Sequence, residues 1–73
     1  MVTKQISINT IKDMMDFVNE ASKVFGDVLI RKGKYIIDGK SIMGIVSIDP
    51  STGITIEYPE DATDFEAFLT ERF

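Results

Sequence analysis

Residues 38–47, with the sequence DGKSIMGIVS, constrain the fold of this chain more than any other stretch. The pair Asp38-Gly39 ends the apolar run before it, as turn residues do. Ser41 stands directly before an apolar group and makes a good helix N-cap, because its hydroxyl can accept a hydrogen bond from a backbone N–H two or three residues ahead. The segment therefore predicts a strand end, a turn and a short helix over residues 41–48.

This short helix is intrinsically weak and unusually apolar. Gly44 in its middle costs roughly 1 kcal/mol relative to alanine. Five of the seven residues in 42–48 are apolar, whereas two turns of helix bury only one stripe against a sheet. On spacing alone a capped core helix is the simpler interpretation, but an exposed apolar cluster indicates a protein partner. The partner-binding surface predicted in this way comprises Met15, Ile42, Met43 and Val46.

The first third of the chain predicts a strand and an amphipathic helix. Residues 4–8 alternate polar and apolar side chains, which places Ile6 and Ile8 toward the core. Thr10 and Asp13 form a weak capping box at the start of a helix that Gly26 ends. Helical spacing predicts an apolar face of Ile11, Met14, Met15, Val18, Ala21, Ser22 and Phe25, widened by Phe17 and Val24.

A hairpin, a fourth strand and a last helix complete the pattern. Residues 27–31 and 35–38 predict two strands joined by a tight turn at 32–33, and 54–58 alternate cleanly, giving a strand with one wet face. The basic side chains at the hairpin are interpreted as a solvated tip that blunts a sheet edge: Arg31, Lys32 and Lys34. The core side of the last helix is predicted to be Ala62, Phe65, Phe68 and Leu69.

The predicted order β-α-β-β-α-β-α indicates an α+β fold of one domain, residues 1–73. Alternating strands favour a four-stranded antiparallel sheet with one solvated face, so the helices pack on the other face as a two-layer open-faced β-sandwich. A ferredoxin-like arrangement is the alternative, but the hairpin over 27–38 and the extra helix make it less natural.

Composition excludes several classes of function. The 73 residues contain no cysteine and no histidine, which rules out disulfides, thiolate chemistry and the usual zinc sites; no metal or other cofactor is expected. The net charge of −4 argues against direct nucleic-acid binding. With no signal peptide and no apolar run near the roughly 20 residues of a membrane span, a cytoplasmic protein without membrane contact is expected.

No catalytic constellation is recognisable, and the chain is not expected to be an enzyme. The glycines are dispersed rather than gathered into a phosphate-binding loop. Carboxylate pairs such as Asp13 with Asp16 fall on a predicted exposed helix face, where they are far more often solvated than catalytic.

The segment of residues 38–47 resembles the regulatory serine segment of HPr, the histidine-containing phosphocarrier of the bacterial sugar phosphotransferase system. Its KSIMG core is most similar to the Gram-positive members, and the order of elements agrees with that family from Lys4 to about Leu69. The resemblance implies the HPr fold, which is the open-faced sandwich already deduced from the residues.

The resemblance stops at the residue that names the family. In HPr a histidine at the start of the first helix carries the phosphoryl group, next to an arginine and a proline. The gapless match places Thr10 at the histidine, Lys12 at the arginine and Asp13 at the proline. Imidazole forms a phosphoramidate that passes its phosphoryl group on, whereas a threonine would form a stable ester. Asp13 would also oppose a phosphate at this helix N-terminus, so Thr10 is predicted to be only a cap.

The resemblance implies a regulatory protein-binding module in place of a phosphocarrier. In the family an ATP-dependent HPr kinase phosphorylates the serine that corresponds to Ser41, and the product binds a transcription regulator in carbon catabolite control. A histidine-less relative with only this role is known. Two alternatives stay open: a degenerate component that docks phosphotransferase enzymes without transferring a phosphoryl group, and an orphan interaction domain on the same fold.

Overall fold

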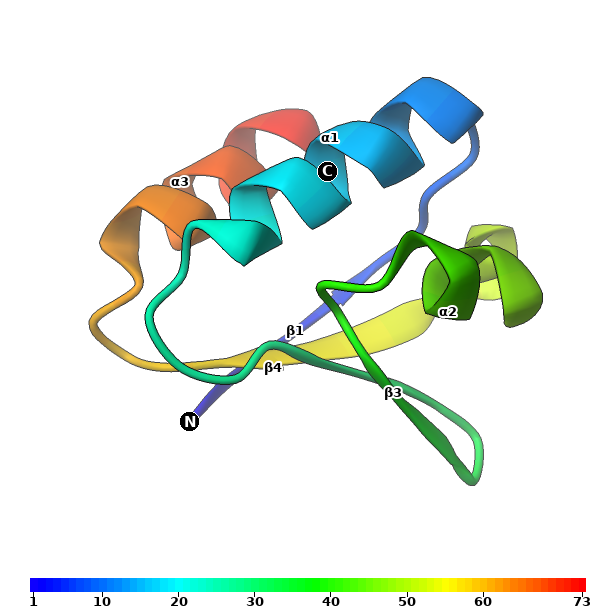
Figure 1. Ribbon diagram of the computed structural model, residues 1–73, viewed down its shortest axis with the longest axis horizontal. Helices are drawn as coiled ribbons and strands as arrows, with labels where there is room; N and C mark the ends of the chain where they lie inside the picture. The colour runs from blue at the N-terminus through cyan, green and yellow to red at the C-terminus, as the bar shows by residue number, and fades with distance from the viewer.

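The computed structural model describes residues 1–73, which form a four-stranded antiparallel sheet with helices on one face (Figure 1). In chain order the elements are β1 (Val2–Ile6), α1 (Ile11–Ser22), β2 (Leu29–Lys32), β3 (Tyr35–Asp38), α2 (Ile42–Ser47), the 3₁₀ turn η1 (Pro50–Thr52), β4 (Ile54–Tyr58) and α3 (Thr63–Arg72). The α+β open-faced sandwich predicted from the sequence is confirmed. None of the helices has the length and apolarity that crossing a bilayer requires.

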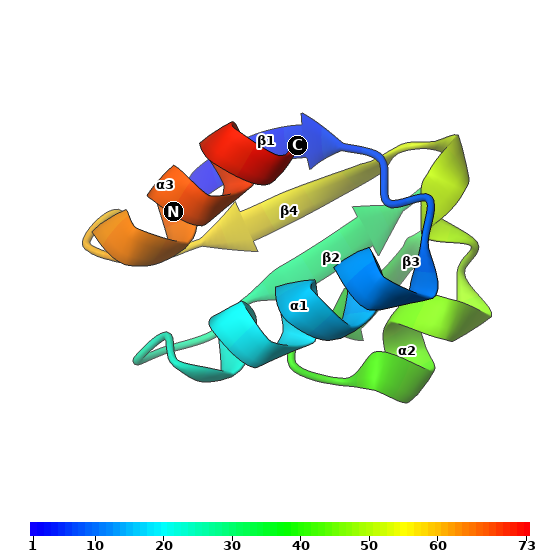
Figure 2. The ribbon, with the colours of Figure 1, turned by 90° about the horizontal axis from the view of Figure 1, so that it is seen from above.

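The strand order β1-β4-β2-β3 places the last strand in the centre, with β1 and β3 at the edges. Ile56 of β4 lies opposite Lys4 of β1 and Ile30 of β2, and both pairings are antiparallel. Viewed from above, α1 and α3 lie side by side over the sheet, and α2 lies beside α1 near β3 (Figure 2). This topology brings the two ends of the chain to the β1–β4 side and the hairpin to the other side.

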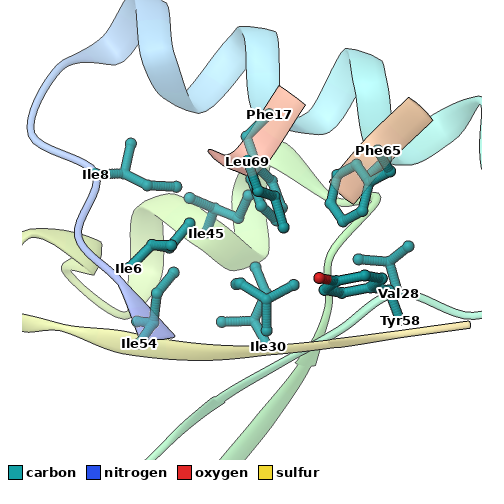
Figure 3. Close-up of a cluster of buried hydrophobic side chains, with 12 residues drawn as sticks. Ile6, Ile8, Phe17, Val28, Ile30, Ile45, Ile54, Tyr58, Phe65 and Leu69 are labelled. Atoms are coloured by element: carbon teal, nitrogen blue, oxygen red, sulfur yellow. The ribbon is translucent and has the colours of Figure 1, made fainter. Parts of the chain in front are cut away.

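One hydrophobic core joins the two layers. Side chains of the sheet point toward the helices and meet those of α1, α2 and α3 (Figure 3). Phe65 stands at the helical side of this core, with its ring edge-on to Phe17 at 5.5 Å and to Tyr58 at 5.3 Å between centroids. The twelve buried apolar residues are Ile6, Ile8, Phe17, Ala21, Val28, Ile30, Ile45, Ile54, Ile56, Tyr58, Phe65 and Leu69.

The predicted apolar face of α1 is confirmed in part, because Met14, Val18 and Val24 pack against the core as expected. The helix ends at Ser22, and Phe25, which was predicted to be a core residue, is 98% exposed. Phe17 and Ala21 are the fully buried residues of α1, whereas Ile11 and Met15 are exposed. The chain leaves the helix early because it must turn into β2, and it does so through Gly26 at a φ of 117°, which only glycine adopts easily.

Three boundaries also differ from prediction. β1 begins at Val2 and ends at Ile6, so Ile8 lies beyond the strand; it is nevertheless buried, and its N–H donates to the carbonyl oxygen of Pro50 at 3.0 Å. The hairpin turn comes at residues 33–34, one position later than predicted, because β2 continues to Lys32. The helix predicted over residues 41–48 is one residue shorter at each end, because α2 begins at Ile42 and ends at Ser47.

Gly39 should be intolerant of a side chain. Its N–H donates to the carbonyl oxygen of Val28 at 2.7 Å, and an added Cβ would lie 2.7 Å from Val28 Cγ1 and 2.9 Å from Val28 O. We expect Gly39→Ala to lower the free energy of unfolding by about 1–3 kcal/mol through overpacking, as measured by urea denaturation.

Gly44→Ala is the matched control for this prediction. An added Cβ there would come no closer than 3.3 Å, to the mobile end of Ile37, and alanine favours the helix by about 1 kcal/mol. A Gly39→Ala protein as stable as the Gly44→Ala protein would contradict the close approach seen at Gly39.

Candidate functional site

Ser41 is the N-cap of α2, as the sequence predicted. The Gly44 N–H donates to Ser41 Oγ at 3.1 Å, and the Ile45 N–H donates to the Ser41 carbonyl oxygen at 3.1 Å. Ser41 itself has extended backbone angles, with a φ of −110° and a ψ of 113°. The side chain therefore satisfies one of the free N–H groups of a six-residue helix that has little propensity of its own.

Lys40 holds the start of α2 against the segment that follows α1. Its Nζ donates to the carbonyl oxygens of Val24 at 3.0 Å and Gly26 at 2.7 Å. Its backbone N–H donates to Asp38 Oδ1 at 2.9 Å. The residue directly before the cap is thus fixed at both its backbone and its side chain, which sets the position of Ser41 relative to α1.

The four residues of the predicted partner-binding surface are all exposed. The exposed fraction is 59% for Met15, 38% for Ile42, 78% for Met43 and 52% for Val46. α2 buries only Ile45 completely, because so short a helix presents one side chain to the core. The exposure that docking requires is present, and docking itself stays a prediction.

A shallow hollow connects α1 and α2 at this surface. It has a volume of about 420 Å³ and brings Met15 of α1 together with Ile42 of α2. Its remaining lining residues are Asp16, Val18, Asn19 and Ser22. Ile42, which directly follows Ser41, therefore forms one surface with Met15 from two different helices.

Thr10 caps α1, and the neighbouring charged residues are engaged in ion pairs. The Asp13 N–H donates to Thr10 Oγ1 at 3.1 Å. Lys12 Nζ pairs with Asp16 Oδ2 at 2.8 Å. Arg72 Nη1, from the end of α3, donates to Asp13 Oδ1 at 3.0 Å and to Asp16 Oδ2 at 2.7 Å.

Arg72 contacts the start of α1, and the sequence did not predict this contact. A cation suits the C-terminus of a helix, and Arg72 also braces the C-terminus of α3 against the first turns of α1. The guanidinium also lies 5.3 Å from the ring centroid of Phe68, a distance suited to a cation–π contact. No local pattern signals this role, because the acidic partners stand more than fifty positions earlier in the chain.

These hydrogen-bonded ion pairs shift the pKa values of Asp16 and Arg72. The hydrogen bond from Arg72, followed by that from Lys12, lowers the pKa of Asp16 below its ordinary value of 3.8. The same bonds, first from Asp16 and then from Asp13, raise the pKa of Arg72. Because the pKa of Asp16 is lower in the folded state than in the unfolded state, its stabilising contribution is complete above about pH 3.8 and is lost as the pH falls through the folded-state pKa.

The structure contains no cluster of three or more His, Cys, Asp or Glu residues placed to hold a metal ion. The site offers a serine hydroxyl that caps α2 beside exposed apolar side chains, together with an exposed threonine cap next to ion-paired residues. An arrangement of this kind can present a modifiable hydroxyl and bind another protein.

Comparison with known proteins relates the chain to solved structures. No family model and no curated protein sequence matches it. The crystal structure of HPr-C-His from Thermoanaerobacter tengcongensis superposes with a TM-score of 0.77 and 26% identity, covering 97% of this chain and 92% of that one. The phosphocarrier protein HPr from Bacillus anthracis str. Ames gives a TM-score of 0.66 and 30% identity, covering 93% and 90%.

Removing the cap at Ser41 should destabilise the chain. We expect Ser41→Ala to lower the free energy of unfolding by roughly 0.5–2 kcal/mol because the Gly44 N–H loses its acceptor. Ser41→Asp should retain most of the stability, since a carboxylate caps equally well. Thermal denaturation of both variants checks this, with Ser47→Ala as the control because Ser47 Oγ donates only to the Gly44 carbonyl oxygen at the exposed end of α2. Equal losses from Ser41→Ala and Ser47→Ala would argue against the cap.

The pKa of Asp16 should depend mainly on Arg72. In the unmodified protein an NMR titration of side-chain carboxyl groups should place it below 3.8, and Arg72→Gln should raise it toward that value. Lys12→Gln should give a smaller rise, because its hydrogen bond is the second cause of the shift. A larger rise in Lys12→Gln would reverse the assigned order of the two contacts.

Proposed function

We propose that this chain, which belongs to the HPr-like family, acts as a regulatory protein-binding module that is switched by phosphorylation of Ser41 and does not carry phosphoryl groups. The observation that carries the proposal is the exposed apolar surface of Met15, Ile42, Met43 and Val46 beside the capped Ser41. HPr kinase and a transcription regulator are the proposed partners.

The start of α1 supports the loss of the carrier role. The chain has no histidine anywhere, and Thr10 stands where the resemblance to HPr places that residue. Its oxygen is engaged in capping, and the two neighbours that would shape a phosphate pocket are an ion-paired lysine, Lys12, and an ion-paired aspartate, Asp13. Phosphate bound here would face the carboxylates of Asp13 and Asp16, a pairing of like charges.

Ser41 supports a regulatory step by its position. Transfer of the γ-phosphoryl group of ATP to Ser41 Oγ forms an Oγ–P bond, breaks the bond to the ADP leaving group and releases the hydroxyl proton. The product carries about −1.5 to −2 additional charge and three more acceptor oxygens. Since Ser41 Oγ already accepts the Gly44 N–H, a phosphoserine oxygen can keep that bond while the others face solvent.

The switch would act by changing the chemistry of the docking surface rather than the fold. Unmodified, the surface is apolar, with Met43 as its most exposed member. After phosphorylation the same surface has a dianionic edge, so a partner with an apolar pocket and basic rim would gain charge-assisted hydrogen bonds. Methionine suits such a surface because its flexible thioether adapts to the partner's shape.

Phosphorylation assays test the proposal directly. Incubation with phosphoenolpyruvate and the first enzyme of the phosphotransferase system should leave the chain unlabelled, and Thr10→His alone should also stay unlabelled because Lys12 and Asp13 are unchanged. ATP and an HPr kinase should add one acid-stable phosphoryl group, seen by intact mass and absent in Ser41→Ala. HPr from Bacillus anthracis serves as the carrier control.

Two results would overturn the proposal. An acid-labile phosphoryl group on this chain would restore a carrier role, and an inert Ser41 in the kinase assay would reduce it to a helix cap. Met43→Glu separates modification from docking, because it should accept the phosphoryl group normally and fail to bind the regulator. Phe25→Glu is the control at an apolar residue outside α2 that is even more exposed, and it should both accept the phosphoryl group and bind the regulator.

A further inference from the structure

β3 is an edge strand with an apolar exposed surface. β2 lies on one side of it and no strand lies on the other. Tyr35 and Ile36 both have more than half of their side-chain surface exposed. The hairpin formed by β2 and β3 projects away from the helical layer (Figure 1). An exposed edge with these side chains is a template for pairing with another strand.

The register of the hairpin determines which backbone groups of β3 point outward. The Gly39 N–H donates to the Val28 carbonyl oxygen, and inward and outward groups alternate along an antiparallel strand. Ile37 and Tyr35, two and four residues before Gly39, therefore face β2. The N–H and C=O groups of Ile36 point away from the sheet, as does the N–H of Asp38, whose carbonyl oxygen accepts the Ser41 N–H.

The positive charges that were expected to blunt this edge are mostly directed elsewhere. Arg31 forms an ion pair with Glu57 of β4. Lys32 Nζ donates to the carbonyl oxygens of Ile48 and Asp49 beyond α2. Lys34 alone keeps an ammonium group without a partner in the chain. The interpretation of all three as a solvated tip is therefore wrong for Arg31 and Lys32.

We propose that β3 is a self-association edge, on which two copies of this chain pair antiparallel about a twofold axis at Ile36. The outward N–H and C=O groups of Ile36 then exchange two hydrogen bonds with those of Ile36 in the second copy. A slip by one residue would place outward groups opposite inward groups, so the alternation selects this register over its neighbours. A twofold axis makes the pairing self-limiting at two copies.

The side chains are complementary in this register. Lys34 of each copy faces Asp38 of the other, and Tyr35 of each copy faces Ile37 of the other. Each half of the symmetric ladder therefore has one opposite-charge pair and one aromatic–aliphatic pair. Pairs of these kinds stabilise antiparallel strands. The Asp38 side chain is exposed, and its Oδ1 accepts only the Lys40 N–H, which leaves its charge available to Lys34.

The shape of the molecule accommodates the second copy. A hollow of about 730 Å³ lies between the hairpin and α2, with Tyr35, Ile37 and Ile48 among its lining residues, and the Tyr35 ring of the second copy would cover Ile37 there. Antiparallel pairing sets the hairpin tip of one copy beside the base of the other. Because so short a ladder buries less than a standard interface, we expect a dissociation constant of roughly 0.1–1 mM.

Complementary charge variants test the proposal. Sedimentation equilibrium of the unmodified chain should show the average mass rising from the monomer's 8.2 kDa toward the dimer's, with concentration-dependent NMR shifts at the Ile36 and Asp38 amides. Lys34→Glu and Asp38→Lys should each weaken association at least tenfold, because each sets like charges opposite one another. Mixing the two variants should restore it, since every charged pair in the mixed dimer is again opposite in sign.

Lys4→Glu is the control, because it makes the same charge change on β1, the opposite edge of the sheet, and should associate like the unmodified chain. A mass that stays at the monomer value up to millimolar concentration would overturn the proposal. Three other results would also overturn it. They are association that Lys34→Glu does not weaken, association that Lys4→Glu abolishes, and association that does not return when Lys34→Glu and Asp38→Lys are mixed.

Discussion

The rest of the structure depends on the packing of the inner face of β4 against the helices. Ile54, Ile56 and Tyr58 are buried there, between β1 and β2 and beneath the helices. At 73 residues a chain buries only about 60% of its unfolded surface, so a single strand that contacts both neighbouring strands and the helical layer supplies a large share of the core. No buried polar side-chain atom is left without a hydrogen-bond partner, and the hydroxyl of the buried Tyr58 donates to Glu66 Oε1 at 3.1 Å.

The exposed apolar surface of α2 results from how few side chains of this helix the core can accept. The helix has six residues and buries only Ile45, so its other apolar side chains remain exposed at Ile42, Met43 and Val46. Such a helix needs support from outside itself, because two turns are too short to be stable in isolation. The Ser41 cap and the Lys40 contacts with Val24 and Gly26 provide that support. The groups that stabilise α2 are therefore the same groups that position its exposed side chains.

The parts of this arrangement that depend on neighbouring residues were predictable from the sequence. The caps at Thr10 and Ser41 and the alternation of β4 are local patterns, and the structure confirms them. The exposure of Phe25 was not predictable, because the apolar residues from Ile11 to Phe25 continue the helical spacing and only the early end of α1 removes Phe25 from the helix. The contacts of Lys40 and Arg72 were not predictable for another reason. Their partners lie on distant segments of the chain, which come close to these residues only in the folded protein.

The start of α1 combines a helix cap with a group of ion pairs. A phosphate pocket at a helix N-terminus requires free N–H groups and nearby positive charge. In this chain Thr10 occupies one of those N–H groups, and the charges of Lys12 and Arg72 are neutralised by Asp13 and Asp16. These ion pairs are exposed, so each adds little stability by itself, but Arg72 joins two carboxylates on α1 to the end of α3 and so fixes the spacing of the two long helices. The ion pairs beside the Thr10 cap thus brace the helical layer on which Met15 is exposed.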